Sequence, residues 1–182
     1  MKVTETGFKD LLILEPLVLE DERGYFSESY NYATFLKNQI DITFVQDNQS
    51  FSKNGVLRGL HFQKQPFAQT KLVRVLSGEI IDVVVDLREN ESTFKRTFQV
   101  KLSHDNRRQL LVPKGFAHAF VVLSENASVL YKCDEYYNKR SEGGIRFDDP
   151  DLGIDWGTAK ENLIVSPKDM SLPFLSNLNY SF

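Results

Sequence analysis

Cysteine is almost absent from this 182-residue chain, and its scarcity limits the chemistry that the fold can use. Cys133 is the only cysteine, so no disulfide can form within the chain. A reducing, cytoplasmic location is therefore expected. The local sequence VLYKCDEYY places no histidine beside Cys133, which favours a small buried strand residue over a nucleophile.

Long apolar runs and an excess of positive charge are also missing. LLIL near the N-terminus is far too short to span a bilayer, and no charged start or cleavage site of a signal peptide accompanies it. The net charge is −3, whereas broad nucleic-acid or acidic-membrane surfaces need a basic excess. We expect no nucleic-acid and no membrane partner. The length suits one well-filled domain over residues 1–182.

Short apolar runs divided by turn residues make up most of the chain. The runs predicted as strands are ITFVQDN, VLRGLHFQ, KLVRVL, GEIIDVVVDLR, TFKRTFQVKLS, RQLLVP, HAFVVLS and ASVLYKCDEYY. IIDVVVDL is apolar at both parities, which indicates a strand covered on both faces. Many short strands with frequent turn signals are typical of an antiparallel β-sandwich or barrel.

Helical signals are few. Asn31 can cap a short helix over NYATFLKNQ, after a strand pair that bends at residues 22–24. Ser166, then a proline, then Asp169 have the order of a helix start, which favours a structural role for this aspartate over a catalytic one. The tail over about residues 166–182 is apolar and aromatic, and we expect it to pack on the body or on a partner.

The segment from Gln46 to Val75 concentrates ionisable side chains within strand-like sequence. Arg58, His61 and Lys71 lie among apolar residues there, and burying such groups costs free energy unless they are paired or used. Together they suggest a site for an anionic small molecule. Arg58 and His61 are three residues apart, so they share a face only if Gly59 marks a bulge or sharp twist.

The remaining histidines and Tyr131 each have a structural alternative. His104 lies in the polar turn LSHDNRR and is expected in solvent. His118 begins the apolar run AHAFVVL, and its role as a hydrogen-bonded strand residue or as part of a site stays open. Tyr131 shares strand parity with Cys133, so it can be a buried tyrosine whose hydroxyl is satisfied.

A metal centre is the main rival interpretation of these histidines. A strand-borne site needs His-x-His and a carboxylate, whereas the chain has His61-Phe62-Gln63. No metal site is therefore predicted. The residues by themselves indicate a β-sandwich with an anion-binding pocket, and no more.

A series of ordered motifs resembles the dTDP-4-dehydrorhamnose 3,5-epimerase family of the cupin superfamily. They are DERGYFSESYN, TFVQDNQS, VLRGLHFQ, QTKLVRVLSGEIIDVVVDLR, VPKGFAHAFVVLSE, LYKCDEYY and EGGIRFDDPDLGIDW, and they run from about Leu12 to the tail. PKGFAH is similar to the second cupin signature, P-x-G-x-x-H. The resemblance implies an all-β, cupin-type antiparallel jelly roll with a few short peripheral helices, working without a cofactor.

The resemblance also implies an activity and its residues. The reaction is 3,5-epimerisation of dTDP-4-dehydro-6-deoxy-D-glucose to dTDP-4-dehydro-L-rhamnose through an enolate, in dTDP-L-rhamnose biosynthesis. His61 matches the general base, Asp169 its carboxylate partner, Tyr131 the general acid and Lys71 the cation beside the keto oxygen. The substrate-contact positions are Arg23, Glu28, Gln46, Asp47, Asn48, Arg58, Lys71, His118, Tyr137, Glu142 and Lys168. Tyr137 matches the aromatic residue that stacks on thymine.

Three other functions share much of this pattern. They are a C3-only epimerase, a keto-sugar isomerase acting on a nucleotide-linked sugar, and a non-catalytic sugar-nucleotide-binding cupin. The set of His61, Lys71, Tyr131 and Asp169 argues against the last of these. Because family members pair through strands, and because the tail is apolar, a homodimer is expected.

Overall fold

The computed structural model describes residues 1–180 and 182, and most of its elements are β-strands. The strands are β1 (Lys2–Glu5), β2 (Leu12–Glu15), β3 (Val18–Asp21), β4 (Gly24–Ser27), β5 (Gln46–Lys53), β6 (Val56–Gln63), β7 (Lys71–Ser77), β8 (Glu79–Asp86), β9 (Thr97–Ser103), β10 (Gln109–Val112), β11 (Phe116–Val122), β12 (Asn126–Cys133), β13 (Glu142–Gly144) and β14 (Ile164–Val165). The helices are α1 (Tyr32–Lys37), α2 (Pro167–Met170) and 3-10 turns at Lys139–Ser141, Lys160–Asn162 and Leu175–Asn177. None of the helices in this described part of the chain has the length and apolarity needed to cross a bilayer.

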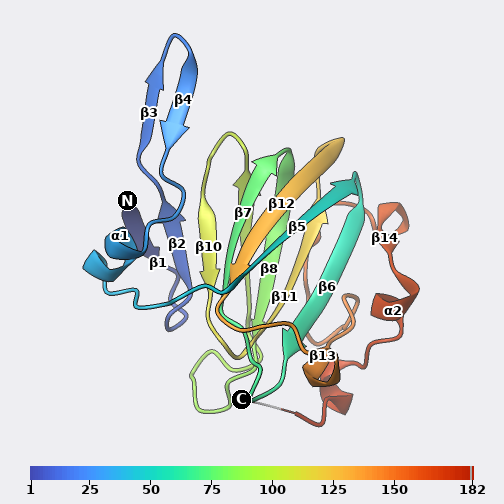
Figure 1. Cartoon of the computed structure of the whole chain (residues 1–182). Helices are drawn as coiled ribbons and strands as arrows, with labels where there is room; N and C mark the ends of the chain where they lie inside the picture. Colours follow the sequence, from blue (N-terminus) through green and yellow to red (C-terminus); the bar gives the residue numbers. More distant parts are fainter. Residues whose placement is uncertain (181) are drawn as a thin grey trace.

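Two antiparallel sheets pack face to face and form the body of the molecule (Figure 1). The first sheet has the order β1-β2-β10-β7-β12-β5, and the second has the order β13-β6-β11-β8-β9 with β14 added in parallel beside β6. Their inner faces supply one apolar cluster that contains Val73 and Val129 from the first sheet and Val84 and Phe120 from the second. The predicted all-β, cupin-type sandwich is confirmed.

The strand that is apolar at both parities, β8, is covered on both faces as predicted. Ile80 and Val84 face the cluster between the sheets, whereas Val83 and Val85 belong to a second cluster on the outer face. The chain after β13 covers that outer face and anchors it with Trp156. Burial on both sides explains why no polar alternation marks this strand.

Helix α1 is short, and its start is the predicted one. The side chain of Asn31 accepts a hydrogen bond from the backbone N–H of Thr34 at 3.2 Å. Phe35 is buried against Leu72 and Leu111, so the helix covers part of the outer face of the first sheet. Residues 42–45 were predicted as strand but lie outside β5, because Phe44 packs into this same cluster under the helix.

The strand predicted for residues 93–103 begins only at Thr97. Thr93 donates its hydroxyl to the buried carboxylate of Asp86 at 2.6 Å, and Lys95 has a φ of 63°. The segment before β9 is therefore a turn. Its polar residues close the end of β8 rather than extend the sheet.

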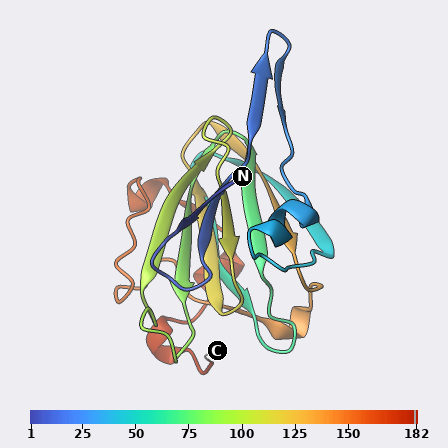
Figure 2. The same cartoon turned by 90° about the vertical axis from the view of Figure 1, so that its left-hand side faces the viewer.

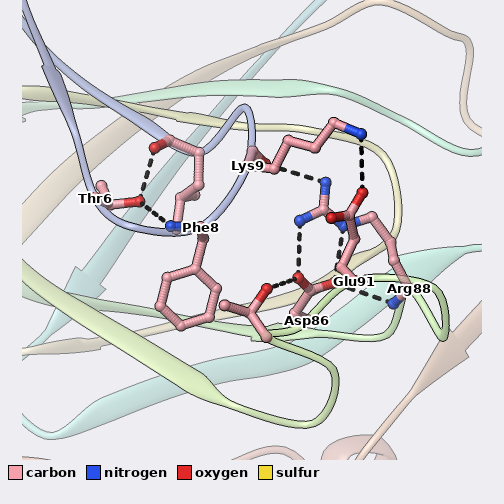
Figure 3. Close-up of polar contacts among 8 residues, drawn as sticks. Thr6, Phe8, Lys9, Asp86, Arg88 and Glu91 are labelled. Carbon is pink, nitrogen blue, oxygen red and sulfur yellow. Dashed lines mark hydrogen bonds and ion pairs between the residues drawn. The ribbon is translucent and has the colours of Figure 1, made fainter.

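A polar network ties this turn to the N-terminal segment (Figure 3). Asp86 is fully buried and accepts two hydrogen bonds from the Arg88 guanidinium, at 2.8 Å from Nε and 2.7 Å from Nη2. Arg88 also donates to the backbone carbonyl of Lys9, and the Lys9 ammonium pairs with Glu91 at 3.0 Å. The network fixes two loops that are far apart in sequence.

The hairpin of β3 and β4 projects away from the sandwich in both views (Figures 1 and 2). It is a separate two-stranded sheet, and Leu17, Leu19, Tyr25 and Phe26 are exposed on it or beside it. By contrast, the C-terminal tail packs on the body. Leu178, Tyr180 and Phe182 contact the outer cluster, where the Tyr180 ring stacks on Phe62 with centroids 5.9 Å apart.

Candidate active site

A cavity of ≈ 670 Å³ opens between the two sheets. Its walls come from β6 and β11 of the second sheet, from β7 and β12 of the first, and from the segment leading into α2. The candidate residues that line it are Arg58, His61, Lys71, His118, Tyr131, Lys168 and Asp169. A smaller hollow of ≈ 140 Å³ shares His61, Lys71 and Tyr131 with it and adds Gln46, Asn48, Tyr137 and Glu142.

The bulge on which convergence of Arg58 and His61 depends is present in β6, and both residues line the same cavity. Between these two residues β6 takes three steps where the paired strand β11 takes two. Gly59 has a φ of +128°, and a Cβ built on it would lie 2.4 Å from the Cβ of Ala119. Only glycine combines this φ with so close an approach of two strands.

His61 forms a close pair with Asp169. The distance from Nε2 to the carboxylate oxygen Oδ1 is 2.7 Å, and the other oxygen accepts from the Gly59 N–H at 3.4 Å. Burial opposes ionisation of Asp169, but hydrogen bonds from His61 and Gly59 and the charge of His61 outweigh it, so the pKa of Asp169 is lowered. Asp169 is 4% exposed, whereas the His61 side chain is 40% exposed and opens to the cavity.

Asp169 also occupies the predicted helix start. Its backbone N–H donates to the Ser166 hydroxyl at 3.1 Å, which makes Ser166 the N-cap of α2. The side chain of Asp169 remains available for His61. The helix start therefore does not exclude a second role for the carboxylate, which pairs with His61.

Lys71 and Tyr131 lie side by side on neighbouring strands of the first sheet. The Lys71 ammonium is 6.0 Å from the centre of the Tyr131 ring. Burial lowers the pKa of Lys71, and the negative charge of Asp82 acts in the opposite direction. Burial raises the pKa of Tyr131, so its phenol stays protonated at neutral pH.

The carboxylate of Asp82 is a site residue that the sequence interpretation missed. It is fully buried, and both of its oxygens lie 2.9 Å from Nε2 of His118. His118 lines the cavity and pairs with His61 across β11 and β6. The sequence feature that could have revealed Asp82 is its position inside the apolar run IIDVVVDL, where an unpaired carboxylate would cost free energy.

The smaller hollow is polar and has an aromatic rim. Gln46 donates to Asn48 at 3.0 Å and accepts from the backbone N–H of Tyr137 at 3.0 Å. Glu142 pairs with Lys168 at 2.8 Å; burial acts against ionisation, but this contact prevails and lowers the pKa of Glu142. The Tyr137 ring is half exposed beside them, so a planar group can reach it.

Three of the predicted contact residues line neither hollow. Asp47 faces the opposite side of β5, where its carboxylate pairs with Lys132 at 2.9 Å. Arg23 is at the turn of the projecting hairpin and pairs with Asp21, while Glu28 lies between the hairpin and α1. Within one chain, these residues are not brought to the cavity.

Cys133 and His104 take the positions that the sequence indicated. Cys133 is buried in β12, where burial raises the pKa of its thiol to about 11. His104 is half exposed beside Asp105. Among residues 1–180 and 182, no group of three or more His, Cys, Asp or Glu side chains could hold a metal ion.

An antiparallel sandwich that encloses a histidine–carboxylate pair, an ammonium group and a phenol defines a cupin-type protein with an acid–base site. The family model described as dTDP-4-dehydrorhamnose 3,5-epimerase matches residues 5–177. The chain belongs to the dTDP-4-dehydrorhamnose 3,5-epimerase family.

Known relatives are similar over nearly their whole lengths. The dTDP-4-dehydrorhamnose 3,5-epimerase of Salmonella typhimurium is 51% identical over 177 residues, which are 96% of this chain and 96% of that protein. A crystal structure of the Elizabethkingia anophelis enzyme has a TM-score of 0.93 at 52% identity and covers 99% of each chain. The Legionella pneumophila enzyme, solved in complex with dTDP-4-keto-L-rhamnose, has a TM-score of 0.93 at 45% identity and covers 98% of this chain and 94% of its own.

Proposed function

We propose that the protein is a dTDP-4-dehydrorhamnose 3,5-epimerase that converts dTDP-4-dehydro-6-deoxy-D-glucose into dTDP-4-dehydro-L-rhamnose. The observation that carries the proposal is the His61–Asp169 pair, at 2.7 Å, in one cavity with Lys71 and Tyr131. Family membership over residues 5–177 supports it. A cytoplasmic location fits a chain with one unpaired, buried cysteine.

His61 is the proposed base at both reacting carbons. The C4 ketone makes the protons on C3 and C5 acidic, because the carbanion left behind delocalises into an enolate. An imidazole with an unperturbed pKa of about 6.5 suits proton removal near neutral pH. Asp169 holds the ring by Nε2 and stabilises the imidazolium that forms. Positioned acid–base catalysis of this kind contributes roughly 10²–10⁴-fold.

Lys71 is the proposed partner of the enolate oxygen. Lys71 lines the cavity, and burial desolvates its ammonium group. A fixed cation acts strongly on a developing negative charge in such a place. His118 extends from β11 of the second sheet into the lining of the same cavity. Because Asp82 occupies Nε2 of His118, the other ring nitrogen is the one left for substrate.

Tyr131 is the proposed acid that returns the proton. It extends from β12 in the first sheet, whereas His61 extends from β6 in the second. The two groups therefore approach a bound sugar from different walls of the cavity. Epimerisation needs this arrangement, since a proton leaves one face of the carbon and another arrives on the opposite face.

The nucleotide is proposed to occupy the polar side of the site. Arg58 suits the pyrophosphate, because a guanidinium fork matches phosphate oxygens. Tyr137 suits stacking on the thymine, with Gln46, Asn48, Glu142 and Lys168 around it. Binding energy from this remote part of the substrate would hold the sugar in position for chemistry.

We further propose a homodimer in which the projecting hairpin packs on the second copy. Phe26 is 68% and Leu19 59% exposed, and apolar exposure of this kind marks an interface. The tail does not offer such a surface, because it is packed on its own body. Reciprocal packing would give Arg23 and Glu28 a route to the partner's cavity, in keeping with their expected contact with substrate.

Proton exchange in D₂O tests the function directly. Incubation with the keto-sugar nucleotide should replace hydrogen by deuterium at both C3 and C5, as followed by proton NMR. Exchange at C3 alone would identify a C3-only epimerase. Binding of the nucleotide sugar without any exchange would identify a non-catalytic cupin.

A further inference from the structure

A separate polar pocket of ≈ 130 Å³ lies on the outer face of the first sheet, where residues of the β3–β4 hairpin meet β7 and β10. Arg74 of β7 and Gln109 of β10 form its floor, and both alternate with residues that face the core. The loop between β9 and β10 contributes His104 and Arg107. The pocket shares no lining residue with the catalytic cavity or its smaller hollow.

The lining of this pocket is cationic. It contains two arginines and a histidine but no carboxylate. Glu20 reaches one nitrogen of Arg107 from the rim, at 2.7 Å, and the exposed Asp105 lies 3.3 Å from His104. Arg74 makes no ion pair with any residue in the described part of the chain.

Three buried polar atoms of the pocket lack a hydrogen-bond partner. Two are donors, the Nε–H groups of Arg74 and Arg107, and the third is an acceptor, Oε1 of Gln109. The amide orientation of Gln109 is fixed, because its Nε2 donates to the backbone carbonyl of Ser29 at 2.8 Å. Buried polar atoms without partners are costly, so a bound group that accepts twice and donates once would suit the pocket.

We propose that this pocket binds one hydrogen phosphate ion. The ion has several acceptor oxygens for the two guanidinium groups and one O–H group for Gln109 Oε1. Arginine forks match phosphate oxygens in geometry and charge. Sulfate has the same shape but carries no proton at neutral pH, and a bridging water would leave the charge of Arg74 unpaired. The site is independent of the proposed epimerase reaction.

Occupancy of the pocket would also tie the hairpin to the body. Tyr25 and Ser27 of the hairpin line the pocket, and the guanidinium of Arg107 lies 4.1 Å from the centre of the Tyr25 ring. A ligand held between the hairpin and β7 stabilises the folded state by RT ln(1 + L/Kd), where L is the free ligand concentration, and therefore by more as that concentration rises. Phosphate should therefore raise the melting temperature.

Calorimetric titration with inorganic phosphate tests the proposal. The protein is first saturated with dTDP, so that the catalytic cavity is filled, and ionic strength is held constant with chloride. We expect one phosphate per chain and an affinity for sulfate at least about tenfold weaker, since sulfate lacks the O–H group. Arg74→Gln and Arg107→Gln should each weaken phosphate binding by at least about tenfold. Arg96→Gln, a change at an arginine outside the pocket, should leave it unaltered.

Three results would overturn the assignment. Phosphate binding that survives both pocket substitutions would place the ion elsewhere. Equal affinity for sulfate would remove the role of Gln109 Oε1. The third result is that phosphate does not bind and that the Arg74→Gln variant sediments as a single chain. This would mean that a carboxylate of a second copy fills the pocket. If Arg74→Gln does not fold, Arg107→Gln decides the matter alone.

Discussion

At the scale of single residues, the site depends on carboxylates that hold cationic or hydrogen-bonding partners in place. Asp169 holds His61, and Asp82 holds His118. Each carboxylate is nearly or fully buried, so its position is determined by the fold. The resemblance of motifs identified Asp169, while Asp82 went unrecognised because a single aspartate in an apolar strand indicates burial but names no partner.

Replacing Asp169 by asparagine tests its proposed role as a positioning carboxylate. The amide keeps the shape but cannot stabilise the imidazolium formed when His61 takes a proton. We expect kcat to fall by about 10²–10⁴-fold, with KM nearly unchanged. Steady-state kinetics check this. Asp148→Asn is the matched control, because Asp148 is also ion-paired but lies outside the cavity. A large rise in KM with normal kcat would contradict the assignment.

Replacing Lys71 by methionine removes the proposed enolate partner while keeping its length. Loss of one preorganised donor to an oxyanion costs about 2.7–4 kcal/mol, so kcat should fall by about 10²–10³-fold. Lys101→Met serves as a control, since this lysine is exposed and pairs with Glu79 on β8. Turnover within a factor of about two of the wild type would remove Lys71 from the mechanism.

At the scale of elements, the bulge of β6 is the feature on which the site depends. From the sequence it was expected only as a condition, because Arg58 and His61 share a face only if Gly59 marks a bulge or sharp twist. The close packing around the bulge could not be predicted from the sequence, since only the structure shows that β11 leaves no space beside Gly59. The first residues of β5 and β9 could not be predicted either. Before β5, Phe44 packs under α1, and before β9, Thr93 donates a hydrogen bond to Asp86; each contact overrides the local strand propensity.

Gly59→Ala tests the bulge. A methyl group would meet Ala119 at 2.4 Å and require a strained backbone, so unfolding should be easier by about 1–3 kcal/mol and activity should fall with it. Denaturant melting and kinetics measure both. Gly153→Ala is the control, because Gly153 also has a positive φ, of +55°, but has nothing within 4 Å. Equal behaviour of the two variants would show that close packing at Gly59 is unimportant.

The buried pair of Asp86 and Arg88 is expected to stabilise the loop after β8 in a pH-dependent way. Burial opposes ionisation of Asp86, but hydrogen bonds from Arg88 and Thr93 outweigh it and lower its pKa. Its contribution is therefore present above the pKa of the unfolded state and is lost as the pH falls through the lowered value.

Asp86→Asn should lower the free energy of unfolding by about 3–5 kcal/mol at pH 7, and by less in acid. Urea melts at several pH values measure this. Glu91→Gln, at the partly exposed pair with Lys9, should cost no more than about 1 kcal/mol. A deficit for Asp86→Asn that stays constant down to low pH would contradict the ionised pair.

At the scale of the whole molecule, the sequence determined the sandwich and most of its strands, but not where the hairpin would go. Arg23 and Glu28 were expected at the substrate, yet they lie away from the cavity within one chain. The aromatic tail was expected to pack on the body or on a partner, and it packs on the body, where Tyr180 stacks on Phe62. The pattern of apolar residues predicts which side chains will be buried. It does not predict whether they pack on their own chain or on a partner chain.

The proposed dimer is tested by mixing. Light scattering should give twice the mass of one chain, and Phe26→Glu should shift it toward a single chain. Coexpression of Arg23→Ala with His61→Ala should give mixed dimers with one intact site, provided that the hairpin serves the partner. Activity of the mixture no higher than that of either variant alone would contradict exchange of hairpins between copies.

The most direct test of the central claim is deuterium exchange by His61→Asn, with the variant first shown to be folded and to bind dTDP. One imidazole is proposed to remove the protons from both carbons beside the ketone. NMR in D₂O should therefore show exchange at C3 and at C5 lost together, each by at least about 10²-fold. Exchange that continues at wild-type rate at either carbon would contradict a single base.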